Sequence, residues 1–148
     1  MGYGNDQVFL SSQEREALIW KYLGKCVTVE IDRPIGFHHV TKGVHLDYTV
    51  NYGFLPGVTG GDGEEQDVYV LGIDEPIHTF TGRIIAAVLR ADDNEDKLVA
   101  APEGVTFSKE EIAEAIHFVE KYFDSEVILH RSLSLEKVND PITAAIST

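Results

Sequence analysis

Apolar and polar residues alternate strictly in one short stretch near the start of the chain, residues 26–32, with the sequence CVTVEID. Val27, Val29 and Ile31 alternate there with three polar residues. A period of two is typical of a strand with one buried face and one solvated face. We therefore predict a strand over residues 26–32. Because its neighbours are apolar, we expect Cys26 to be a buried structural thiol.

Further apolar runs between turn signals predict the other strands of a sheet. We expect a buried strand over 81–91, a short strand over 97–102, and a strand over 46–55 that bends at Gly53. Two more strands are expected over 67–74 and 126–130. The segments between them are expected to be a loop at 38–42, a glycine-rich turn at 56–63 and an acidic turn at 92–96.

The apolar period changes to that of a helix near each end of the chain. Ser11 with Glu14, and Ser108 with Glu111, form capping-box patterns that start helices. The second helix carries one apolar face, made by Ile112, Ala115, Ile116, Val119, Tyr122 and Phe123. Several short strands followed by a capped helix predict a small mixed barrel with a helix on its side, in a single domain over residues 1–148.

The charge balance excludes several classes of partner. Twelve Lys and Arg against 25 Asp and Glu give a net charge of −13, whereas nucleic acids and anionic membranes require a basic face. The single cysteine allows no internal disulfide. We also see no signal-peptide pattern and no apolar run long enough to span a membrane, so we expect a cytoplasmic protein.

The acidic residues gather in two clusters that flank the central strands. The first contains Asp62, Glu64 and Asp67, and the second covers 92–96 and is followed at once by Lys97. Such carboxylates either remain solvated or hold a hard cation such as Mg²⁺, which prefers oxygen ligands. The spacing matches no EF-hand, zinc motif, nucleophile elbow, P-loop or dinucleotide fingerprint.

The order of the pieces resembles soluble family I inorganic pyrophosphatase. VTVEID is followed by NYGF, DGEEQDVYVLG, the acidic turn, KLVAAP and a helix with HFVEKYF, and the family's signature is D-x-D-x-x-D shortly after N-Y-G-Y. The resemblance covers roughly residues 27–123. It implies an α+β, mainly β fold: a small closed, OB-like β-barrel with a C-terminal helix packed on it, plus an extra N-terminal helix here.

The resemblance also implies roles for particular residues. Asp67 would be a metal ligand that bridges two metals, and Glu64 would help to deprotonate the attacking water. The further implied metal ligands are Asp62, Glu30, Asp92 and either Glu95 or Asp96. The implied phosphate-binding residues are Lys97, Tyr52, Tyr122, His39 and Lys42. The implied cofactor is Mg²⁺, with Mn²⁺ as an alternative, the implied substrate is pyrophosphate or a related phosphoanhydride, and the family commonly forms homo-oligomers.

The chain departs from the family pattern at three places. Glu64 replaces the middle aspartate, Phe123 replaces a lysine, and a shorter loop with His38, His39 and Lys42 replaces an upstream lysine and arginine. Arg33 and Arg90 are candidates to compensate for the missing cations. Two alternatives therefore stay open beside pyrophosphate hydrolysis: a related hydrolase of another phosphoanhydride, and a non-catalytic cation-binding module.

Overall fold

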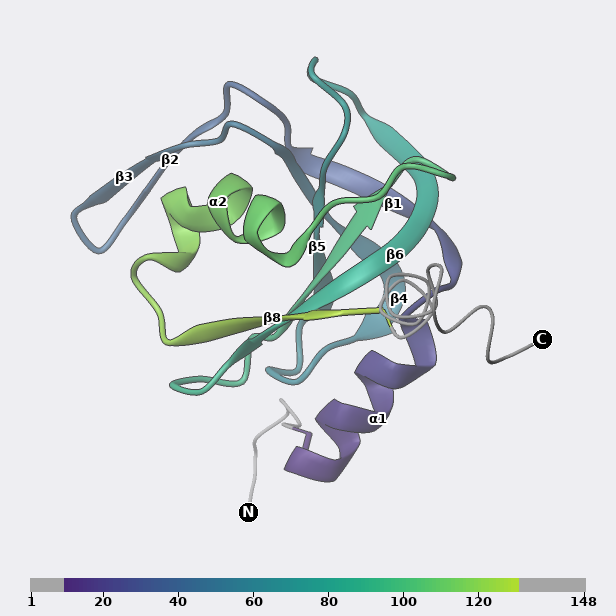
Figure 1. Ribbon diagram of the computed structural model, residues 1–148. Helices are drawn as coiled ribbons and strands as arrows, with labels where there is room; N and C mark the ends of the chain where they lie inside the picture. Colours follow the sequence, from purple (N-terminus) through teal and green to yellow (C-terminus); the bar gives the residue numbers. More distant parts are fainter. Residues whose placement is uncertain (1–9, 131–148) are drawn as a thin grey trace.

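A computed structural model describes residues 10–130 of the 148-residue chain (Figure 1). Its elements are α1 (Ser12–Tyr22), β1 (Cys26–Arg33), β2 (His38–Thr41), β3 (Val44–Asp47), β4 (Asn51–Thr59), β5 (Glu65–Val70), β6 (Thr79–Arg90), β7 (Lys97–Ala101), α2 (Lys109–Glu120) and β8 (Ser125–Leu129). No helix among residues 10–130 is long and apolar enough to cross a membrane.

Five strands close into a barrel. The order is β1-β4-β5-β7-β6, and β1 also pairs with β6, which joins the two ends of the sheet. The β5–β7 pair is parallel, whereas the other pairs in the barrel are antiparallel. Strand β8 extends the sheet beyond β6, and β2 with β3 forms a separate hairpin. The expected closed, mainly β, OB-like barrel is confirmed.

Side-chain alternation along the strands divides the core between two faces. Val29, Leu55 and Val68 point into the barrel, together with other buried residues of β6 and β7. Tyr52 and Tyr69 alternate with these residues and therefore lie on the outer face, in a second cluster that includes α2 and β3. The predicted acidic site lies on this outer face, so its polar residues are next to an apolar layer.

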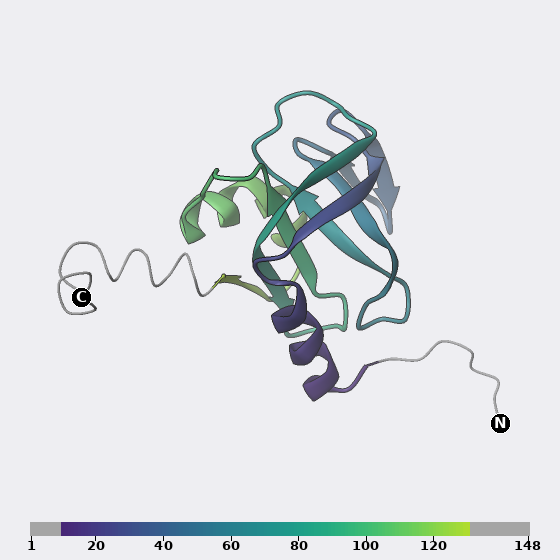
Figure 2. The ribbon, with the colours of Figure 1, turned by 90° about the vertical axis from the view of Figure 1, so that its right-hand side faces the viewer.

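The two helices cover different parts of the barrel (Figure 2). Both begin with the predicted capping boxes, at Ser11 and Ser108. Helix α1 adds Ile19, and its C-cap adds Leu23, to the inner cluster, whereas α2 packs Ile112 and other apolar residues on the outer face. The barrel therefore has a helix at one end and another on its side.

Several local expectations were wrong. The single strand expected over residues 46–55 is divided between β3 and β4, the turn expected at 56–63 begins only after β4 ends at Thr59, and the strand expected over 67–74 ends at Val70. Cys26 is exposed, because the alternation that buries Val29 and Ile31 places it on the solvated face of β1. Residues 38–42 are not a loop, because β2 pairs with β3 in a hairpin that turns at Lys42 and Gly43. Tyr122 is 50% exposed, since α2 ends at Glu120 and the helical face does not reach that far.

Candidate functional site

The centre of the candidate site is Asp67, on the outer face at the start of β5. Asp67 pairs with Phe54 of β4, and Phe54 pairs with Glu30 of β1. Residues that pair across neighbouring strands point to the same face, so Glu30 and Asp67 share the outer face with one strand between them. Strand register therefore puts the two candidate metal ligands on the same face, two strands apart.

Asp67 belongs to a tightly bonded group with Tyr52 and Lys97. Its Oδ2 accepts hydrogen bonds from the Tyr52 hydroxyl at 2.6 Å and the Lys97 ammonium at 2.7 Å. Lys97 also donates to the Tyr52 oxygen at 2.8 Å. Burial, together with the Asp67 charge, raises the pKa of Tyr52 well above its usual value, so the phenol stays protonated. Among residues 10–130 no donor reaches Oδ1 of Asp67, which leaves that oxygen as an acceptor for a cation.

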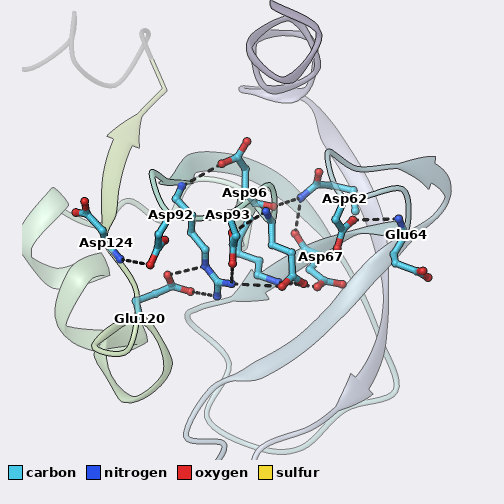
Figure 3. A network of polar contacts seen from close by, with 12 residues as sticks. Asp62, Glu64, Asp67, Asp92, Asp93, Asp96, Glu120 and Asp124 are labelled. Atoms are coloured by element: carbon cyan, nitrogen blue, oxygen red, sulfur yellow. Dashed lines mark hydrogen bonds and ion pairs between the residues drawn. The ribbon is translucent and has the colours of Figure 1, made fainter. Parts of the chain in front are cut away.

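The turn before β5 holds Asp62 and Glu64. Oδ1 of Asp62 accepts the backbone N–H of Glu64 at 3.0 Å, which closes the turn. Figure 3 shows the Glu64 side chain extending away from Asp67. Asp62 lines a small recess with Asp67, Glu95, Asp96 and Lys97, whereas Glu64 does not line it. In this conformation Asp62 faces the site and Glu64 does not.

The second acidic cluster divides its side chains between opposite sides of the loop at 91–96. Both carboxylate oxygens of Asp96 bind Arg15 of α1, at 2.8 Å to Nε and 2.7 Å to Nη2. Oδ1 of Asp96 also accepts the backbone N–H of Arg90 at 3.0 Å. Glu95 instead lies 3.4 Å from the Lys97 ammonium, on the Asp67 side. Glu95, rather than Asp96, is thus the carboxylate directed toward Asp67.

Asp92 lies at the far end of the same loop. Its Oδ2 accepts the backbone N–H of Asp124 at 3.2 Å, just before β8. Figure 3 shows Asp92 beside Asp124 and Glu120, on the side of the network opposite Asp62 and Glu64. The structure therefore does not bring Asp92 together with Asp67.

Behind the loop lies a buried ion pair that sequence reasoning missed. Arg90 and Glu120 have side chains that are only 3% and 6% exposed, and they form two hydrogen bonds of 3.1 and 2.8 Å. The Tyr69 hydroxyl donates to Glu120 at 2.5 Å, and the Arg90 guanidinium lies 3.5 Å from the Phe123 ring centroid. Burial alone would lower the pKa of Arg90, but the bond and charge of Glu120 raise it overall. Arg90 is thus a structural cation.

The expected phosphate-binding residues are more widely spread. His39 and Lys42 lie on the β2–β3 hairpin, and burial together with the nearby positive charge of Arg33 lowers the pKa of His39. Arg33 donates to the Tyr48 hydroxyl at 2.6 Å, and its guanidinium lies 5.5 Å from the Tyr52 ring centroid. Arg33 is thus a second cation, besides Lys97, that lies next to Tyr52.

Asp32 also belongs to this face, although only Glu30 was selected from the strand. Burial raises the pKa of Asp32, Arg33 opposes that shift, and the charges of Asp67 and Glu30 add to it. These couplings show that the three carboxylates lie within electrostatic range. The alternation in CVTVEID already placed Asp32 on the same side as Glu30.

The carboxylates around Asp67 are chemically suited to bind a hard divalent cation. Within the described part of the chain no three His, Cys, Asp or Glu side chains form a ready-made metal site. Several carboxylates nevertheless face the same region, namely Glu30, Asp32, Asp62, Asp67 and Glu95. Oxygen ligands of this kind, completed by water and phosphate, are what Mg²⁺ requires.

Comparison with known proteins gives a consistent result. Residues 24–141 match the family model described as inorganic pyrophosphatase. The inorganic pyrophosphatase of Ehrlichia chaffeensis has a TM-score of 0.56 and 18% identity, over 74% of this chain and 89% of that chain. The enzyme of Neisseria gonorrhoeae has a TM-score of 0.53 and 15% identity, over 74% and 86%. The enzyme of Helicobacter pylori has a TM-score of 0.51 and 19% identity, over 83% and 95%. No curated protein sequence matches the chain.

Proposed function

The chain belongs to the inorganic pyrophosphatase family, and on this basis we propose how its own residues carry out the hydrolysis of pyrophosphate to two phosphates. The resemblance inferred from the sequence is confirmed, and the enzyme is a phosphoanhydride hydrolase. The observation that carries the residue assignment is the group formed by Asp67, Tyr52 and Lys97, because it places a carboxylate, a phenol and an ammonium together on the outer face of the barrel.

The family depends on divalent metal, and the residues that would hold it are Glu30, Asp62, Asp67 and Glu95. When bound, the metal lowers the pKa of a water molecule and neutralises phosphate oxygens. We place Glu95 in this set instead of Asp96, because both oxygens of Asp96 are already bonded to Arg15. Mg²⁺ is our proposed metal, with Mn²⁺ as an alternative.

Lys97 acts on the substrate side, and Tyr52 orients it. The Lys97 side chain is 4% exposed, so its ammonium is held by Asp67 and Tyr52 and points in a fixed direction. A fixed cation of this kind stabilises charge that develops on a phosphate oxygen without the cost of reorienting solvent. Tyr52 remains a neutral phenol because its pKa is raised, and it donates its single hydroxyl proton to Asp67, so it helps to hold Asp67 and the Lys97 ammonium in place.

Arg33 is our proposed replacement for the family cations that the shorter upstream loop lacks. Its guanidinium lies over the rings of Tyr48 and Tyr52 and donates one hydrogen bond to the Tyr48 hydroxyl. A guanidinium offers five donors and binds phosphate in a bidentate manner, whereas a neutral imidazole such as His39 carries no charge. We assign His39, Lys42 and the exposed Tyr122 only peripheral roles in substrate binding.

The first test is release of phosphate from pyrophosphate with Mg²⁺, with and without a chelator, for the parent protein and for Asp67→Asn. We expect activity that requires metal and falls at least about 100-fold in Asp67→Asn, because the bridge between metal and Lys97 is lost. Asp74→Asn is the matched control, since Asp74 is an exposed acid on the loop after β5. If Asp67→Asn hydrolysed pyrophosphate as fast as the parent, the assignment would be wrong.

The same assay separates the substrates. Nucleoside triphosphates and tripolyphosphate are compared with pyrophosphate at equal metal, and we expect pyrophosphate to have the highest kcat/KM. Assembly into a homo-oligomer and a cytoplasmic location stay predictions, which sedimentation and fractionation would test.

A further inference from the structure

Helix α1 contacts both loops of the site proposed above, although it precedes the residues that match the family model, 24–141. The contact is made by one side chain, Arg15, which is on the second turn of the helix and only 21% exposed. Eighty-one positions separate Arg15 from its main partner, Asp96, so the contact is purely tertiary.

Arg15 fixes the loop at 91–96 through several acceptors at once. Besides the two bonds to Asp96, its Nη2 donates to the backbone carbonyls of Arg90 and Asp93, both at 3.1 Å, and its Nη1 donates to the Asn94 side chain at 3.3 Å. All three guanidinium nitrogens are therefore used. A planar guanidinium can satisfy such a set of acceptors, and an ammonium cannot.

The stem of the same side chain packs on the other acidic loop. A Cβ at Gly61 would lie 3.2 Å from Cγ of Arg15 and 2.6 Å from the backbone oxygen of Asn94. The N–H of Leu10, two residues before α1, donates to the Gly61 carbonyl at 3.1 Å. The N-terminal segment thus holds the turn that carries Asp62 against the loop that carries Glu95.

The Gln66 side chain also links the start of β5 to the 91–96 loop. Nε2 of Gln66 donates to the backbone oxygens of Asp96 at 2.8 Å and of Asp67 at 3.0 Å. Gln66 fixes the loop backbone at Asp96, whereas Arg15 also binds acceptors along the rest of the loop. Without Arg15 the loop would keep the Gln66 bond at Asp96, the Asp124 bond at Asp92 and the contacts of its acids with Arg90, but it would lose its bonds to α1.

We propose that Arg15 is a positioning residue for hydrolysis, which keeps the carboxylates of the two acidic loops facing one another so that they take up metal already ordered. This rests on the proposed metal site, but the role of α1 is specific to this chain. Residues that orient metal ligands typically contribute 10–100-fold to metal affinity or activity. Arg15 would act through Asp96 and the loop backbone, without touching substrate.

The test is Arg15→Met, which keeps the length of the apolar stem and removes the guanidinium. Mn²⁺ affinity is measured by titration calorimetry, and phosphate release is measured as a function of Mg²⁺ concentration. We expect the Mn²⁺ affinity to fall about 10-fold or more. Phosphate release should therefore be slower at low Mg²⁺ concentration, and a high Mg²⁺ concentration should restore much of the rate. Arg15→Lys should recover little of the metal affinity, because one ammonium cannot bind all the acceptors of the planar guanidinium.

Two further variants separate positioning from simple stability. Lys21→Gln removes one positive charge from the exposed last turn of the same helix and should bind metal as the parent does. Gly61→Ala pushes Arg15 and the Asn94 carbonyl apart from the opposite side and should reproduce the metal defect of Arg15→Met. Hydrogen exchange of residues 60–65 and 91–96 should be faster in both Arg15→Met and Gly61→Ala.

The outcomes are distinguishable. If exchange accelerates or the protein is less stable, but the metal affinity of the folded variant is unchanged, Arg15 is only structural and the proposal is overturned. If hydrogen exchange in the two loops is unchanged in Arg15→Met, then Arg15 does not order them and the proposal is overturned. If the parent releases no phosphate, the proposed function fails, and the Mn²⁺ titrations of parent and variants still decide whether Arg15 orders a cation site.

Discussion

Removal of Glu120 tests whether the buried ion pair with Arg90 is a structural centre of the molecule. In Glu120→Leu the Arg90 side chain, 3% exposed, would lose both hydrogen bonds that it donates to the carboxylate that neutralises it. Only Asp93 and Glu95 would remain as acidic partners, at 3.4 and 3.6 Å. The substitution is close in volume, so the main effect is an uncompensated buried charge.

The magnitude follows from the cost of a stranded ion. Breaking a buried pair from one side typically costs about 3–5 kcal/mol. At about 2–4 °C per kcal/mol for a chain near this size, Tm should fall by roughly 6–20 °C. Arg90→Met should cost a similar amount, because among residues 10–130 it leaves the Tyr69 hydroxyl as the one side-chain hydrogen-bond partner of the Glu120 carboxylate.

The double variant Arg90→Met with Glu120→Leu provides the decisive comparison. It removes both charges together, so its remaining cost should be about 1–3 kcal/mol, mainly from the Tyr69 hydroxyl that loses its acceptor. Urea unfolding followed by circular dichroism, without metal, gives the four free energies of a double-mutant cycle. If the double variant lost the sum of the two single costs, or if Glu120→Leu lost less than about 1 kcal/mol, the reasoning would be refuted.

Two further changes test the backbone and the buried phenol. Gly53→Ala should destabilise the protein by at least about 2 kcal/mol in urea unfolding, because the new Cβ would lie 1.9 Å from the Glu30 backbone oxygen, which cannot move aside; a parent-like free energy of unfolding would contradict this. Burial, with the Glu120 charge, raises the folded pKa of Tyr69 well above the unfolded value of about 10. Its contribution is therefore complete below pH 10 and lost as pH rises further. Tyr69→Phe should lose stability less steeply than the parent above pH 10, and equal slopes would argue against this assignment.

Local patterns in the sequence were sufficient for much of the fold. Both capping boxes predicted where the helices begin, because a cap depends on residues three positions apart. The alternation in CVTVEID predicted β1 and its solvated face, and by the same rule it should have placed Cys26 outside. The hairpin at 38–47 was missed because β2 is largely exposed and has no regular apolar face, and because the second half of β3 was assigned to the strand predicted over 46–55.

The sequence by itself determined which acids were available and, through their order, which family they resemble. It could not decide between Glu95 and Asp96, because neighbouring residues at the entry to a strand point in opposite directions. Tertiary structure shows that the two residues have different surroundings: Arg15, far away in the chain, binds Asp96, while Lys97 and Asp67 lie on the side of Glu95, and Glu95 therefore stays our proposed metal ligand. Hydrogen-bond partners of buried charges are chosen by the packing of distant elements, so no local pattern records them.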